Sequence, residues 1–128
     1  MALEVGRDVA APAAAVWDLV VDTARWPEWG PTVARAEVCT GGEGTRIGPG
    51  ATGRVVTSLG PSLGFEILDF EPDRRWTWAV GGVAATGHRV EAIGEGCCRV
   101  TFEVPVWAPP YLAVCRLALR RIARIATA

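Results

Sequence analysis

The side chain best suited to chemistry in this sequence is its single histidine, His88. It lies in a segment where apolar and polar residues alternate, as in a strand that buries one face, and its parity places it on the apolar face. An imidazole held among apolar neighbours could exchange a proton near neutral pH. The alternative is a core histidine whose ring nitrogens are satisfied by a backbone carbonyl or by a nearby hydroxyl such as that of Thr86.

Two further residues could assist a proton transfer. Asp69 has inward parity beside Trp76 and could act as a general acid or base if it is buried, whereas near the end of a hairpin it would be solvated. Tyr111 stands at the start of the last expected helix, where it could donate a hydrogen bond to a ligand carbonyl or serve in packing alone. The candidate catalytic residues are therefore His88, Asp69 and Tyr111.

Other kinds of site find no support in the sequence. One histidine without a serine or cysteine at a distinctive spacing does not make a nucleophilic triad. The glycine-rich stretch 41–50 lacks the Lys-Ser/Thr of a phosphate loop and the spacing of a dinucleotide fingerprint, so a connection between strands is expected there. We expect no metal and no cofactor. The cysteines lack metal-type spacing and are expected to be free thiols: Cys39, Cys97, Cys98 and Cys115.

Composition narrows the class of protein. With 128 residues, half of them hydrophobic, the chain is expected to form one domain over 1–128 with a sizeable core. The formal net charge of −1 gives no long-range attraction to nucleic acid, although all 13 basic residues are arginine, a bias that suggests a GC-rich, bacterial genome. No apolar run reaches membrane-spanning length, and residues 1–9 lack the pattern of a signal peptide. We expect a cytoplasmic protein without stable membrane association.

Six tryptophans favour an apolar pocket, because large rings are costly to leave in water and suit pocket walls. An ordinary aromatic core is the alternative. A hairpin of 62–70 and 75–80 about Pro72 and Asp73 would project its large apolar side chains from one face. The residues expected to line the pocket are Trp26, Trp29, Val38, Phe65, Ile67, Trp76, Trp78, Thr86, Val90, Phe102 and Trp107.

The elements that must position these residues follow from hydrophobic periodicity. Helical periodicity predicts a helix at 12–21, a short helical turn or tight loop at 24–31 and a long helix from about 111 to 126. The last helix carries an apolar stripe that would cover the apolar face of a sheet, on which His88 would lie opposite Phe102. Alternation predicts strands at 3–9, 32–39, 52–59, 62–70, 75–80, 84–93 and 97–104.

Three motifs accompany this order of elements: Ala11-Pro-Ala-Ala-Ala-Val-Trp-Asp18, Trp26-Pro-Glu-Trp29, and Phe70-Glu-Pro-Asp-Arg-Arg-Trp76 followed by Gly87-His-Arg-Val-Glu91. Together with the order of elements, they resemble the SRPBCC superfamily, also called START-like or helix-grip proteins, which includes the polyketide cyclase/dehydrase and lipid-transport families. The resemblance covers nearly the whole chain. It implies an α+β helix-grip fold, in which a seven-stranded curved antiparallel sheet wraps around a long C-terminal helix, two short helices follow the first strand, and a cavity remains inside.

Two kinds of function are implied by the resemblance, both with a small hydrophobic ligand as the partner. A biosynthetic cyclase or dehydrase would hold a polyketide-like or other polycyclic, apolar substrate in a reactive geometry while His88 or an inward carboxylate moves a proton. A carrier or sensor would bind a lipid or similar ligand without chemistry. A core without any cavity would instead favour an interaction protein. Whatever its function, the chain could form a homodimer. The arginines of the last helix could dock a partner or form a solvated face: Arg116, Arg120, Arg121 and Arg124.

Overall fold

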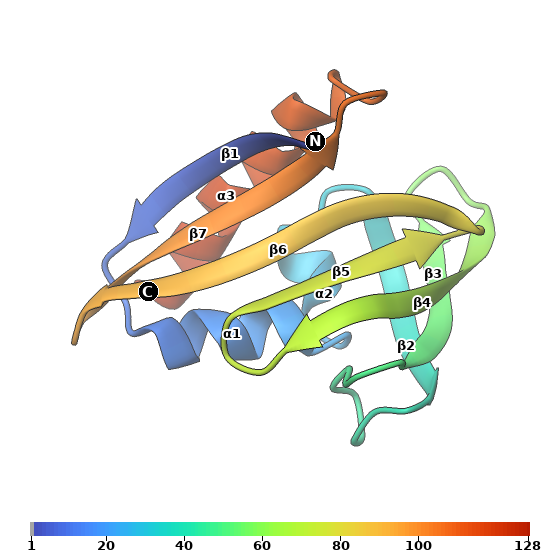
Figure 1. Cartoon of the computed structure of the whole chain (residues 1–128), viewed down its shortest axis with the longest axis horizontal. Helices are drawn as coiled ribbons and strands as arrows, with labels where there is room; N and C mark the ends of the chain where they lie inside the picture. The colour runs from blue at the N-terminus through green and yellow to red at the C-terminus, as the bar shows by residue number, and fades with distance from the viewer. Residues whose placement is uncertain (1) are drawn as a thin grey trace.

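The computed structural model describes residues 2–128, and Met1 lies outside the described residues. One antiparallel sheet of seven strands runs in the order β1-β7-β6-β5-β4-β3-β2, with the helices packed on one of its faces (Figure 1). This is the expected α+β helix-grip arrangement. The strands are β1 (Ala2–Val9), β2 (Val33–Thr40), β3 (Thr52–Thr57), β4 (Ser62–Glu71), β5 (Arg75–Val80), β6 (Val83–Gly94) and β7 (Cys97–Pro105); the helices are α1 (Ala13–Val21), α2 (Trp26–Trp29) and α3 (Tyr111–Ala126).

The strands β6 and β7 form the part of the sheet that carries the histidine. His88 pairs with Phe102 across the two strands, as the alternation predicted. The apolar parity of both strands faces inward because only that face meets the helices. The buried side chains of this face are Thr86, His88 and Val90 from β6 and Cys98, Val100, Phe102 and Val104 from β7.

The β4–β5 hairpin overturns the inward placement of Asp69. Ile67 pairs with Trp78 and Phe70 with Trp76, so two residues of β4 stand opposite the single Thr77. Such a bulge shifts the alternation by one residue, turning Phe70 inward and Asp69 outward. The side chain of Asp69 is 69% exposed, and its carboxylate accepts a hydrogen bond from the Thr77 hydroxyl on the outer face. Asp69 is therefore the solvated residue that the sequence allowed, and it does not reach the inner face.

The two tryptophans of α2 tie this short helix to the end of α1. The last carbonyls of an α-helix lack partners within the helix. Here the indole N–H of Trp26 donates to the Val20 carbonyl and that of Trp29 donates to the Leu19 carbonyl, each at 2.9 Å. Both rings are buried as a result, and the spacing of three residues places them on one face, as expected for a helical turn.

Helix α3 lies against β1, β7 and the other two helices. Its predicted apolar stripe is confirmed at Cys115, Leu119 and Ile122, which are buried together with Ala118, whereas Leu112 is half-buried. All four cysteines are free thiols, as predicted. Among the described residues, no helix is both long enough and apolar enough to cross a membrane.

On the outer face, an ion-pair cluster fixes the strands behind the histidine. The Glu103 carboxylate accepts hydrogen bonds from Arg75 at 2.7 Å and from Arg89 at 3.0 Å, and these three residues come from β7, β5 and β6. The hydrogen bonds from Arg75 hold the pKa of Glu103 below its usual value. Because both arginine side chains are partly exposed, each pair contributes at most about 1 kcal/mol, but together they connect the three strands that carry the site.

Candidate functional site

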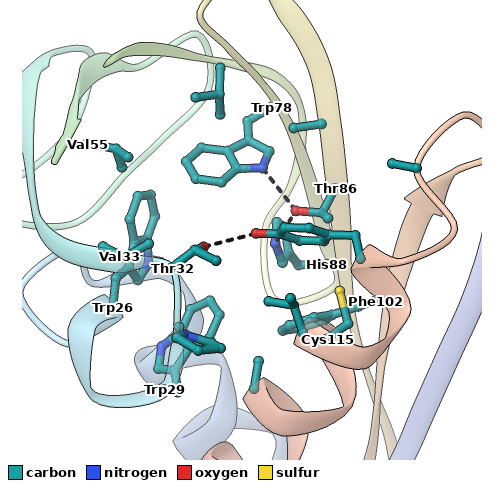
Figure 2. A pocket seen from close by; sticks show the side chains of 18 of the residues that line it. Trp26, Trp29, Thr32, Val33, Val55, Trp78, Thr86, His88, Phe102 and Cys115 are labelled. Atoms are coloured by element: carbon teal, nitrogen blue, oxygen red, sulfur yellow. Dashed lines mark hydrogen bonds between the residues drawn. The ribbon is translucent and has the colours of Figure 1, made fainter. Parts of the chain in front are cut away.

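A cavity of about 330 Å³ lies between the inner face of the sheet, α2 and the first half of α3 (Figure 2). This volume is at the lower end of the roughly 300–1,000 Å³ typical of small-molecule sites. The sequence left open whether the inner face encloses a space or a filled core, and the structure contains the space. Residues expected to bind ligand that do line it are Trp26, Trp29, Trp76, Trp78, Thr86, Phe102 and Trp107.

The remaining residues expected at the pocket do not line it. Phe65, Ile67 and Val90 have the predicted inward parity but are buried in the filled part of the core. Val38 is half-buried and packs against that core, close to Gly42. Parity predicts which face a side chain occupies, but it does not predict where along the strand the core is hollow.

One wall of the cavity is a rigid aromatic cluster centred on Trp26. Its ring stacks on Trp76, with the centroids 5.5 Å apart and an interplanar angle of 11°. It also meets Trp78 edge-on at 5.3 Å and Phe65 at 5.5 Å. Because the indole N–H is held by the α1 carbonyl, the ring cannot rotate without breaking that bond, and the wall presents a fixed apolar surface.

His88 stands on the adjacent wall, at the polar corner of the cavity. Its ring stacks on Trp76 with the centroids 3.8 Å apart. The Nε2 atom lies 3.0 Å from Thr86 Oγ1, and Nδ1 lies 3.4 Å from the Trp76 carbonyl oxygen. Thr86 Oγ1 in turn accepts the indole N–H of Trp78 at 3.0 Å (Figure 2). We call these three side chains, Trp78, Thr86 and His88, the Thr86 corner.

Burial decides the charge of this histidine. Complete removal from water lowers the pKa of His88 to about 3, although the nearby Trp76 carbonyl acts in the opposite direction. The imidazole is therefore neutral at physiological pH. Both nitrogens have partners, a backbone carbonyl and the Thr86 hydroxyl, which is the arrangement that the sequence offered as the alternative to acid–base chemistry.

Tyr111 forms a second polar pair at the cavity. Its hydroxyl lies 3.0 Å from the Thr32 hydroxyl, so the start of α3 is connected to the segment before β2. Burial raises the pKa of Tyr111, which keeps the phenol protonated. The neighbouring Cys115 thiol has its pKa raised by burial to about 11, so it is a poor nucleophile near neutral pH.

The sequence missed part of the lining. Thr32 contributes from the segment before β2, and Val33 and Val55 contribute from β2 and β3. Their inward direction could be read from alternation only once the strand ends were known. Cys115 and Ala118 could have been found, because they are small residues on the apolar stripe of a helix that faces several tryptophans. In residues 2–128, no group of three or more His, Cys, Asp or Glu side chains could hold a metal ion.

The chain matches one protein family and is similar in structure to several known proteins. Residues 2–126 match the family described as "Polyketide cyclase / dehydrase and lipid transport". The structure is similar to that of the protein XoxI from Bacillus cereus, at 12% identity and a TM-score of 0.73, over 98% of this chain and 95% of that one. No curated protein matches the sequence.

Two similar structures are described as aromatase/cyclases. The Zhui aromatase/cyclase from Streptomyces sp. R1128 is 16% identical, with a TM-score of 0.71 over 99% of this chain and 93% of that one. The di-domain ARO/CYC BexL of the BE-7585A biosynthetic pathway is 17% identical, with a TM-score of 0.71 over 97% of this chain and 45% of that one. At these identities the similarity shows a shared fold.

Proposed function

Because this chain belongs to the polyketide cyclase/dehydrase and lipid transport family, we propose that it binds one small, mostly apolar, ring-bearing molecule in its internal cavity. The observation that carries the proposal is the cavity itself, a space of about 330 Å³ beside a cluster of fixed indole rings. Rings held in place lose little conformational freedom when a flat guest stacks on them.

The polarity of the lining supports an uncharged guest. The described residues around the cavity include no Asp, Glu or Arg side chain, and the only titratable side chains among them, His88, Tyr111 and Cys115, are uncharged near neutral pH. A buried charge without a partner is costly, so an ionised ligand would bind poorly. The hydroxyl and indole groups instead offer a few directed hydrogen bonds, as in other small-molecule sites.

The test is to fill the cavity from inside. Ala118 on α3 is buried and lines the cavity, whereas Ala113 on the same helix is exposed. In a titration with the neutral fluorescent probe N-phenyl-1-naphthylamine, we expect one probe per wild-type chain. Ala118→Phe should weaken binding at least tenfold because its ring occupies the same space. Ala113→Phe should change the dissociation constant less than twofold.

Far-UV circular dichroism establishes that each variant is folded before the titration is read. If Ala118→Phe does not fold, Val55→Phe fills the cavity from the opposite wall, where Val55 is buried and lines it on β3. Binding of the probe to a folded, cavity-filled variant with wild-type affinity would show that the probe does not enter the cavity, and the proposal would fail.

A cyclase or dehydrase is the second candidate function, favoured by the similarity to two aromatase/cyclases. Its mechanism would rest on shape: the cavity would hold a reactive chain in a near-attack geometry. Asp69 takes no part because it lies on the outer face, and the neutral His88 is a weak base. Tyr111 is then the side chain best suited to donate a hydrogen bond to a developing oxyanion. A non-catalytic carrier or sensor would use the same cavity.

A turnover assay with a synthetic poly-β-keto thioester separates these functions. If the protein is a cyclase, Tyr111→Phe should lower kcat by about tenfold or more while binding of the naphthylamine probe changes less than twofold. An unchanged kcat would exclude Tyr111 as the donor and leave templating alone. Absence of turnover by the wild-type protein would favour the carrier or sensor.

A further inference from the structure

We propose that the Thr86 corner selects a ligand that donates a hydrogen bond, such as a phenol, over one that can only accept. This inference rests on the proposed function, because it names the class of ligand that the same cavity takes. It follows from the partners of the two ring nitrogens of His88, a backbone carbonyl and the Thr86 hydroxyl.

The Trp76 carbonyl fixes the tautomer of His88. A carbonyl oxygen only accepts hydrogen bonds, so His88 Nδ1, which lies 3.4 Å from it, must carry the imidazole proton. The opposite tautomer would place two lone pairs against each other in a buried site, which is costly. His88 Nε2 is therefore the unprotonated nitrogen and can only accept.

Thr86 is fixed by its two neighbours. Its hydroxyl lies 3.0 Å from His88 Nε2 and must donate its single proton there. Its oxygen also receives the indole N–H of Trp78 at 3.0 Å. A hydroxyl has one proton and two lone pairs, so one lone pair of Thr86 Oγ1 is left. Every N–H and O–H of the Thr86 corner is already in use.

A ligand that contacts Thr86 Oγ1 therefore meets an acceptor, and no donor of the Thr86 corner is free. The neighbouring Trp76, whose ring stacks on His88, keeps a buried indole N–H without a partner, but this group does not belong to the chain of hydrogen bonds through Thr86. A ligand hydroxyl can donate to the remaining lone pair of Thr86, whereas a carbonyl or ether oxygen would face that lone pair without a proton between them. Thr86 lines the cavity, and Figure 2 shows its oxygen between Trp78 and His88. Sites built to hydrogen-bond one group reject analogues that leave buried polar atoms unpaired.

The Tyr111–Thr32 pair does not discriminate in this way. Two hydroxyls carry two protons, and their mutual hydrogen bond at 3.0 Å uses only one of them. The pair keeps one free proton and free lone pairs, so it can turn to suit a ligand donor or acceptor. The preference is thus a property of the Thr86 corner, where the immobile carbonyl of Trp76 sets the direction of the whole chain of hydrogen bonds.

The experiment compares two ligands with the same ring, 2-naphthol and 2-methoxynaphthalene, by calorimetric titration at pH 7. We expect wild-type protein to bind 2-naphthol about tenfold more tightly, and Thr86→Ser, which keeps the hydroxyl, to retain most of this ratio. Thr86→Val, which has a similar shape without the oxygen, should reduce the ratio to about one. Thr40→Val, the same substitution at an exposed threonine outside the cavity, serves as the control and should leave the ratio unchanged.

Each outcome has a definite reading. Equal affinities in the wild-type protein, or a ratio unchanged in Thr86→Val, would overturn the inference while the cavity still binds ligand. A preference for 2-methoxynaphthalene would mean that the corner presents a donor, and would overturn it as well. If neither compound binds and the naphthylamine probe also fails, the proposed function falls with the inference.

Discussion

Replacing Trp26 with alanine should lower the free energy of unfolding by about 3–5 kcal/mol, the range for removing a large buried aromatic side chain. Trp26 is 1% exposed, and the centroid of its ring lies within 5.5 Å of the ring centroids of three aromatic neighbours. The substitution also leaves the Val20 carbonyl without its indole donor at the end of α1. Urea unfolding followed by circular dichroism at 222 nm measures the effect without depending on tryptophan fluorescence.

The matched control is Trp107→Ala. Trp107 also lines the cavity, but it is 65% exposed at its rim, so its removal should change the free energy of unfolding by no more than about 0.5 kcal/mol. Comparable losses in the two variants would contradict the central place given to Trp26. The order of the aromatic wall would then not depend on Trp26.

Lowering the pH from 7 to 5 should reduce the free energy of unfolding by about 2 kcal/mol. His88 has a pKa of about 3 in the folded protein and an ordinary value of 6.5 when the chain is unfolded. Below pH 6.5 the unfolded chain takes up a proton that the folded protein does not, so stability falls by about 1.4 kcal/mol per pH unit. The loss ends only near pH 3, where the folded protein is protonated too.

His88→Gln isolates this effect, because glutamine keeps polar atoms at the site and does not titrate. Its free energy of unfolding should be lower than that of the wild type at pH 7 but nearly flat between pH 7 and pH 5. Glu103, whose pKa is lowered from 4.5, acts mainly below this window. Equal wild-type stability at pH 7 and pH 5 would show that the imidazole is protonated within the fold.

The sequence predicted the inner face of the sheet well wherever alternation is unbroken. In β6 and β7 it placed Thr86, His88 and Phe102 on the correct face and paired the last two. Side chains alternate between the two faces of a strand, so the orientation of all of them is fixed once one face is known to be buried. It failed at Asp69 because the bulge in β4 has no signature in the local residues. One extra residue there reversed every orientation up to the hairpin end.

The sequence predicted an aromatic cavity but not all of the residues that line it. Tryptophan content indicated an aromatic pocket, and seven of the residues assigned to it do line it. Phe65 was misplaced because the ring of Trp26 packs against it, with the centroids 5.5 Å apart, and the indole bond to the Val20 carbonyl holds that ring in place. Ile67 is likewise buried and does not line the cavity. The hydrophobic periodicity of a sequence does not predict which carbonyl will accept an indole N–H, because that depends on how the folded chain packs.

The most direct test of the account is the crystal structure of the protein with 2-naphthol bound. We predict one molecule inside the cavity, with its ring beside Trp26, Trp76 and Trp78 and its hydroxyl oxygen within about 3 Å of Thr86 Oγ1. A ring inside the cavity with its hydroxyl turned away from Thr86 would contradict the selectivity alone. Density for the ligand only on the outer surface, with the cavity unchanged, would contradict the central claim that a ligand binds in the cavity between the sheet and α3.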